Sequence, residues 1–233
     1  MYGKRKEPRS KCLLEALDAL IDQHHLLNHP FYQAWAEGAL SKETLQVYVE
    51  QYYQHVRAFP ENLKKLADRA PEPLSAMVRD NLAHQLNSTA PHPMLWRQFA
   101  QSLGVSESSM NSVRPLPAIA ALLDGFDEVA TYGTMTEAVA AFYAYEVQVP
   151  EMSASKIAAL RRFYNVDEPR AVAYFATRRE ADVRHRAAWR SWLVSRPEMD
   201  ALSAMCSAER ALKALWGALD AVYPQPCTVA ARN

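Results

Sequence analysis

The segment RREADVRH, residues 178–185, combines side chains suited to metal binding or proton transfer with one that is not. On a helix, Asp182 and His185 are three residues apart and point from one face, as two metal ligands or an acid/base pair would. Arg178 stands four residues before Asp182 and shares that face. A guanidinium stays protonated and cannot bind a metal ion, so Arg178 could instead supply a fixed cation to Glu146 or pair directly with Asp182.

Other candidate residues stand inside apolar helical segments. Glu146 ends the run AVAAFYAYE, and a carboxylate beside such an apolar face must be paired, protonated or bound to a cation. His92 begins the segment HPMLW, where a lone histidine is more often a hydrogen-bonded core residue than a ligand. Together with Asp182 and His185 these residues would suit an iron-type metal in a helical bundle. The sequence alone does not show that they converge.

The elements that must position these residues are predicted to be helices. The chain of 233 residues contains only 6 glycines, and its apolar residues recur at three- and four-residue spacing, which predicts an all-α fold. Ser41 and Thr136 are expected to start helices, and Pro60 is expected to break the helix over 42–68. The uniform composition predicts a single domain over residues 11–223, with flexible segments at 1–10 and 224–233.

Charge and composition exclude several classes of partner. The formal net charge is zero, so neither nucleic acid nor a membrane surface is expected to attract the chain. No apolar run is long enough to span a membrane, and we expect a cytoplasmic protein. Three cysteines without CxxC spacing argue against a disulfide framework or a thiolate zinc site. The expected partners are a small molecule and a second copy of the chain in a homodimer.

Several segments resemble a known superfamily and follow one another in the expected order. These are HPFYQAW (29–35), YYQHVRAFPENL (52–63), DNL with HPMLWRQF (80–99), AFYAYEVQVPEMSASKI (141–157) and YFATRREADVRH (174–185). Through them the chain resembles the haem-oxygenase-like superfamily that includes the TenA group. Within it the chain resembles the CADD-like proteins and, more distantly, the pyrroloquinoline-quinone synthases. The resemblance implies a haem-oxygenase-like helical bundle.

The resemblance also implies a two-metal site with two of its six ligand positions altered. The retained ligands are His92, Glu146, Asp182 and His185, whereas Gln85 and Arg178 stand where a glutamate and a histidine belong. An amide is a weaker ligand than a carboxylate and a guanidinium is none, so at most one iron or manganese per chain, or none, is expected. Arg178 would then supply the cation that a metal ion otherwise provides. Whether His84 compensates for Gln85 stays open, as does an Arg178 side chain that extends to solvent.

CADD-like proteins are implied to make para-aminobenzoate by cleaving one of their own tyrosines with O2. The matching residues are Tyr32 as the consumed tyrosine, Tyr48 as a second tyrosine of the site and Lys156 as the amino donor. Judged without the resemblance, the two tyrosines would be core residues and Lys156 a solvated helix residue. A self-modifying enzyme of this kind needs no small-molecule substrate.

Three hypotheses for the function follow from these residues. The first is an O2-dependent CADD-like oxidase with a degraded metal site, in which Tyr32, Tyr48 and Lys156 react. The second is a metal-free oxidase, similar to pyrroloquinoline-quinone synthase, in which Arg178 binds the carboxylate of an aromatic or carboxylate substrate. The third is a non-catalytic binding protein of the same fold.

Overall fold

The computed structural model of the chain describes residues 10–87, 89–196 and 200–223. Within these ranges the side chains of residues 10–12 and 179–183, and therefore that of Asp182, are outside the description. The predicted flexible segments 1–10 and 224–233 also lie outside the described residues, apart from Ser10, which begins the first helix.

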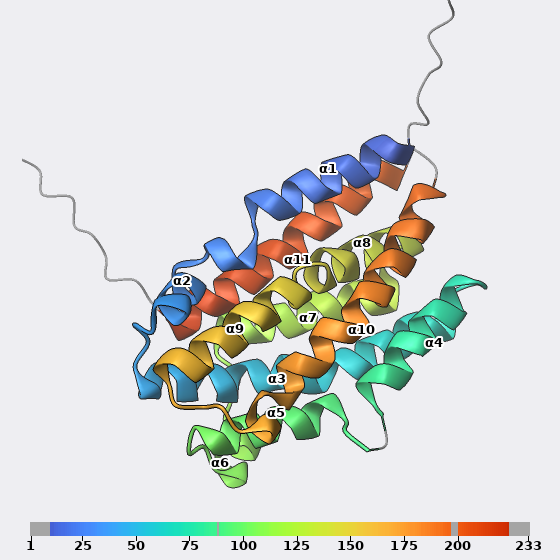
Figure 1. The fold of residues 1–233 in the computed structure, drawn as a ribbon. Coiled ribbons are helices and arrows are strands. Elements are labelled where there is room, and N and C mark those ends of the chain that lie inside the picture. Colours follow the sequence, from blue (N-terminus) through green and yellow to red (C-terminus); the bar gives the residue numbers. More distant parts are fainter. Residues whose placement is uncertain (1–9, 88, 197–199, 224–233) are drawn as a thin grey trace, which may run out of the picture.

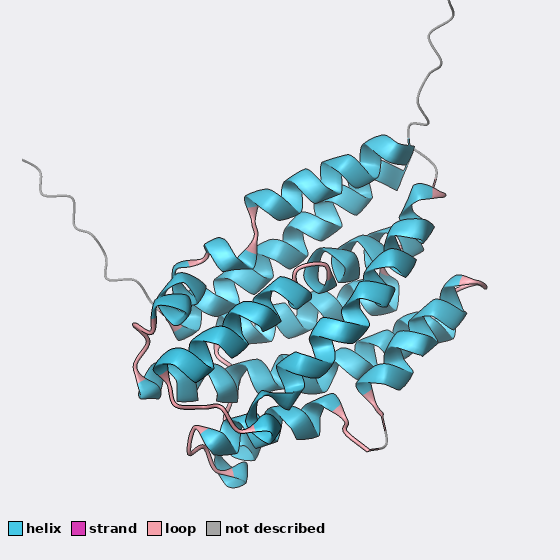
Figure 2. Ribbon diagram, in the orientation of Figure 1, coloured by secondary structure: helices cyan, strands magenta, loops and turns pink. Residues whose placement is uncertain are grey.

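The described residues form α-helices joined by short connections, with one 3-10 turn and no strand (Figure 2). The predicted all-α class is therefore confirmed. The elements are α1 (Ser10–Gln23), η1 (Leu26–Asn28), α2 (Pro30–Glu37), α3 (Lys42–Arg69), α4 (Leu74–Gln85), α5 (His92–Ser102), α6 (Glu107–Ser112), α7 (Pro117–Tyr132), α8 (Met135–Glu146), α9 (Val149–Phe163), α10 (Pro169–Val194) and α11 (Ala201–Val222).

Local signals set most of the helix starts. The hydroxyl of Ser41 accepts the N–H of Thr44 and caps α3, as its position in the sequence predicts. The start predicted at Thr136 is two residues late, because Thr134 caps α8 and forms a reciprocal capping box with Glu137. Thr136 lies in the first turn of α8, where it donates a hydrogen bond to Asp200.

The break predicted at Pro60 is wrong, because α3 runs without interruption through that residue. A proline inside a helix removes one hydrogen bond and costs roughly 3 kcal/mol or more in isolation. Here Phe59, Pro60 and Leu63 are buried, and α3 packs against α4, α5 and α7. Tertiary packing along this helix therefore outweighs the local preference for a break.

The helices pack as one bundle in which the first and last helices lie side by side. The first helix, α1, packs against α10 and α11, and α11 in turn packs against α7 and α8 (Figure 1). The long helix α10 contacts α8, α9, α5 and α4, so it connects opposite parts of the bundle (Figure 1). Every residue from Ala138 to Glu146 of α8 is buried. The bundle therefore forms a single domain, with α8 at its centre.

Among the helices that the structure describes, none combines the length and apolarity needed to cross a bilayer. The cytoplasmic location and the homodimer expected from the sequence stay predictions.

Candidate active site

Three residues singled out in the sequence, one from each of three helices, meet in the interior. Tyr32 on α2, Tyr48 on α3 and Lys156 on α9 are all at most 5% exposed. The amine of Lys156 donates a hydrogen bond to the hydroxyl of Tyr48 at 3.0 Å, and the hydroxyls of Tyr48 and Tyr32 are 3.2 Å apart. The same amine lies 4.7 Å from the centre of the Tyr32 ring. A basic nitrogen is thus held against the ring of the tyrosine that the resemblance implies is consumed.

The surroundings of Lys156 change its ionisation. The rings of Trp35, Tyr52 and Phe175 lie within 5.3 to 5.8 Å of its amine, so the group is enclosed by aromatic side chains. Burial, together with the positive charge of Arg178, lowers the pKa of Lys156 to about 7. Near neutral pH a large share of this lysine is therefore a free amine, which is the nucleophilic form.

The pKa values of the two phenols beside this amine, Tyr32 and Tyr48, shift in the opposite direction. Burial raises the pKa of Tyr32 and of Tyr48 above the usual value for tyrosine. Both hydroxyls therefore keep their protons near neutral pH. A protonated hydroxyl of Tyr48 can donate to one neighbour and accept from the other, so it can connect Lys156 with Tyr32.

Arg178 lies inside the bundle and does not extend to solvent. Its side chain is 2% exposed, and Nη1 donates hydrogen bonds at 3.4 Å to the hydroxyls of Tyr145 and Tyr174. Its guanidinium carbon lies 5.4 Å from the centre of the Tyr145 ring. The charge of Arg178 contributes to lowering the pKa of Lys156 and of His92, which places it within electrostatic reach of both.

Glu146 is completely buried and receives several hydrogen bonds. The side-chain amide of Asn81 donates to its two oxygens at 2.9 and 3.0 Å, and the indole N–H of Trp189 donates to Oε2. The amide of Gln85 donates in turn to Oδ1 of Asn81 at 3.3 Å. Neutral N–H donors therefore stabilise this buried carboxylate.

Three imidazoles cluster in the interior, and one of them, His92, lies within electrostatic reach of Arg178. The ring centre of His84 lies 5.0 Å from that of His92 and 5.5 Å from that of His185. Burial first, and then the charge of Arg178, lowers the pKa of His92 to about 2, so this ring is neutral. The structure thus brings His84, His92 and His185 together, and the side chain of Asp182 lies outside the described part.

The described residues do not fit a two-metal centre. Among the side chains that the structure describes, no three of His, Cys, Asp or Glu are arranged to hold a metal ion. The guanidinium of Arg178 occupies space inside the site and adds a positive charge, which repels a metal ion. The oxygens of Glu146 already accept hydrogen bonds from Asn81 and Trp189. The single iron or manganese expected from the sequence stays a prediction.

Sequence reasoning missed several residues of this interior. Asn81 and Trp189 hold Glu146, and Tyr52 is hydrogen-bonded to Tyr145 through hydroxyl oxygens 2.9 Å apart. His55 is 1% exposed, and within the described part of the chain neither ring nitrogen has a hydrogen-bond partner. The one signal available was polar residues repeated along the buried face of a helix, as with Tyr48, Tyr52 and His55 on α3.

Comparison with known proteins identifies the family of the chain. The model of the TENA/THI-4/PQQC family matches residues 15–204. The chain belongs to this family. Among its curated relatives, 4-aminobenzoate synthase of Chlamydia muridarum (strain MoPn / Nigg) is 35% identical over 217 residues, which covers 92% of this chain and 91% of the relative.

Solved structures show the same fold. A domain from Shewanella denitrificans OS217 with a haem-oxygenase-like fold superposes with a TM-score of 0.77 and 18% identity, covering 91% of each chain. A CADD-like protein from Nostoc punctiforme PCC 73102 gives a TM-score of 0.75 and 14% identity, covering 92% of this chain and 96% of the other. The haem-oxygenase-like helical fold predicted from the sequence is therefore confirmed.

The hydrogen bond from Trp189 to Glu146 generates a prediction with a matched control. Trp189→Phe removes the N–H donor to a buried carboxylate, whereas Trp35→Phe removes an indole N–H that has no partner within the described part of the chain. Both indoles are 1% exposed, so the loss of ring volume is comparable. We expect Trp189→Phe to lower the free energy of unfolding by about 1.5 to 3 kcal/mol more than Trp35→Phe. Urea denaturation measures the difference, and equal losses would show that the bond contributes nothing.

Proposed function

We propose that this chain is an O2-dependent enzyme that forms 4-aminobenzoate from its own Tyr32. The observation that carries the proposal is the amine of Lys156, buried and 4.7 Å from the centre of the Tyr32 ring. Relatives named 4-aminobenzoate synthase support the proposal, since they are 32 to 35% identical to this chain and cover 89 to 92% of it.

The chemistry of the product explains why these two residues must be neighbours. A tyrosine side chain already contains a benzene ring with a one-carbon substituent opposite its oxygen. Conversion to 4-aminobenzoate breaks the Cα–Cβ and Cζ–O bonds of Tyr32 and the Cε–Nζ bond of Lys156. It forms a Cζ–Nζ bond and oxidises Cβ to the carboxylate, while Cα of Tyr32 gains a hydrogen, the phenol oxygen leaves as water and Cε of Lys156 becomes an aldehyde carbon. Dioxygen is the oxidant; it supplies the new oxygen atoms, and the rest of it is reduced to water. The nitrogen must therefore approach the ring that carries the leaving oxygen.

The residues around the two reactants prepare them for this exchange. The low pKa of Lys156 provides an unprotonated amine near neutral pH, and the aromatic walls keep bulk water away from it. The hydroxyl of Tyr48 lies between Nζ and the hydroxyl of Tyr32 and can pass a proton from the amine to the departing oxygen. Tyr48 would then be a proton carrier and not a consumed residue.

Arg178 takes over, in this proposal, the electrostatic role that a second metal ion has in CADD-like relatives. Its burial beside Tyr145 and Tyr174 supports that assignment, as does the amide of Gln85 in place of a carboxylate. A single iron or manganese would have His92, Glu146, Asp182 and His185 as candidate ligands. The metal supplies the activation of O2 when it is bound.

The self-modifying reaction predicts a change in the protein itself. After exposure of the purified chain to ferrous iron, reductant and air, we expect 4-aminobenzoate at no more than one molecule per chain and a mass loss that peptide mapping places at Tyr32. Protein labelled with 15N at the lysine side chains should yield 15N-labelled product.

Variants separate this reaction from non-specific oxidation. Tyr32→Phe and Lys156→Met should form no 4-aminobenzoate, whereas Lys213→Met, which changes a lysine on the surface of α11, should form it normally. An intact Tyr32 without product would contradict the proposal and favour a binding protein of the same fold. Unlabelled product from labelled protein would exclude Lys156 as the nitrogen source.

Metal content tests the role given to Arg178 and Gln85. The unaltered chain is expected to bind fewer than two iron or manganese ions, and the double variant Arg178→His with Gln85→Glu is expected to gain an ion because both ligand types are restored. Arg178→Lys with Gln85→Glu is the matched control, since it restores the carboxylate but keeps a cation. Elemental analysis gives the count, and two tightly bound ions in the unaltered chain would refute the assignment.

A further inference from the structure

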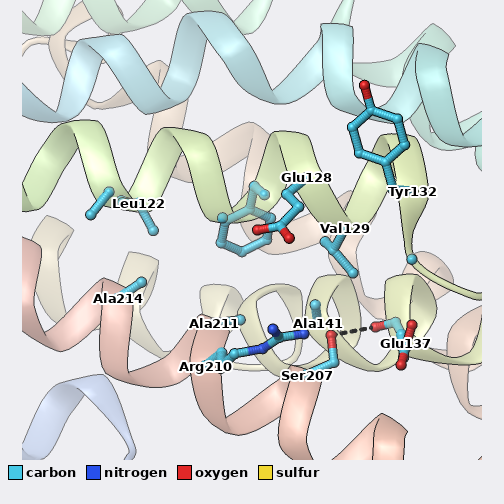
Figure 3. Close-up of a pocket in the computed structure, with 14 residues that line it drawn as sticks. Leu122, Glu128, Val129, Tyr132, Glu137, Ala141, Ser207, Arg210, Ala211 and Ala214 are labelled. Atoms are coloured by element: carbon cyan, nitrogen blue, oxygen red, sulfur yellow. Dashed lines mark hydrogen bonds between the residues drawn. The ribbon is translucent and has the colours of Figure 1, made fainter.

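A cleft lies between α7 and α11, and Glu137 and Ala141 of α8 also line it. Its volume is about 410 Å³, which is within the usual range of roughly 300 to 1,000 Å³ for small-molecule sites. The apolar part of its wall includes Leu122, Val129, Ala141, Ala211 and Ala214 (Figure 3), together with Phe126. We call this space the α7/α11 cleft.

Small residues on the two facing helices keep the cleft open. A side chain added at Gly125 of α7 would meet no atom within 4 Å, and Ala211 and Ala214 of α11 present only methyl groups to the same space. Helices whose facing residues are this small cannot fill the groove between them with their own side chains. The cleft is therefore encoded by the sequence of α7 and α11.

Two opposite charges face the α7/α11 cleft from its two walls. Glu128 reaches the space from α7 and Arg210 reaches it from α11 (Figure 3). Within the described part of the chain, the side chains of Glu128 and Arg210 form no ion pair and no side-chain hydrogen bond. Glu137, the third charged residue of the cleft, belongs to the capping box of α8, because its carboxylate accepts the N–H of Thr134 at 2.8 Å.

This arrangement suits a flat ligand with an acceptor at one end and a donor at the other. A carboxylate can form a two-pronged contact with the guanidinium of Arg210, and an amino group can donate to the carboxylate of Glu128. A benzene ring between them would lie against the apolar wall, where Val129 of α7 and Ala214 of α11 face the cleft.

We propose that the α7/α11 cleft is a binding site for an aromatic carboxylate with an amino group opposite the carboxylate, of the 4-aminobenzoate type. The choice of this ligand class rests on the proposed function, and the site itself rests on the cleft and its charges. The cleft adjoins the interior through Phe126, whose ring centre is 5.2 Å from that of His55 and 6.1 Å from that of Tyr145. From His55, ring contacts continue through Tyr52 and Tyr48 to Tyr32, so a series of packed aromatic rings joins the cleft to the buried site.

Calorimetric titration of the full-length Tyr32→Phe chain tests the proposal, because this variant cannot make its own product. We expect 4-aminobenzoate to bind at one site per chain, benzoate to bind more weakly and aniline to bind most weakly. Arg210→Met should weaken 4-aminobenzoate at least about tenfold, as expected for loss of a charge-assisted contact. Glu128→Gln should weaken 4-aminobenzoate but leave benzoate unchanged.

Two further variants complete the design. Arg161→Met, which changes an exposed arginine of α9, should bind as the parent does, and Ala214→Phe should block binding by filling the cleft. Absence of binding, or binding indifferent to Arg210→Met and Ala214→Phe, would overturn the proposal. A change of oligomeric state in Ala214→Phe, seen by size-exclusion chromatography, would overturn it in favour of a second copy as the occupant. None of these results depends on product formation, so failure here and failure of the proposed function are distinguishable.

Discussion

Two basic side chains from different helices share one dry interior, and only one of them keeps its charge across the physiological pH range. Arg178 on α10 retains its proton because a guanidinium is too strong a base to lose it. Lys156 on α9 is equally buried, and burial together with the charge of Arg178 lowers its pKa to about 7. Deprotonation of the amine removes the cost of burying a second cation. The interior thereby holds a fixed cation and a nucleophile.

The two substitutions at expected ligand positions form a consistent electrostatic set. A glutamate in place of Gln85 would bring a second carboxylate close to Glu146, which would require a strong cation between them. The amide of Gln85 instead donates to Asn81, and Asn81 donates to Glu146. Compared with the ligand set that the resemblance implies, the site has one negative charge fewer at Gln85 and one positive charge more at Arg178. A guanidinium cannot bind a metal ion and an amide is a weaker ligand than a carboxylate, so neither residue favours metal binding.

The sequence predicts the fold well because helix signals are local. Ser41 starts a helix as expected, whereas Pro60 fails as a breaker because its effect depends on the packing of the whole of α3. The grouping of Tyr32 with Lys156 came from resemblance alone, since residues from α2 and α9 have no spacing that links them. Asn81 and Trp189 were missed for the same reason: their partner Glu146 lies far away along the chain, and a hydrogen bond between distant segments leaves no periodic pattern.

The ionisation of Lys156 is the property on which the account depends, and it is open to direct measurement. Nuclear magnetic resonance of the chain labelled with 13C at the lysine ε carbons, with Lys156→Met to assign the signal, follows this amine through a pH titration. The account predicts a midpoint near pH 7 for Lys156. A midpoint of about 10.4, the usual value for a solvated lysine, would contradict it.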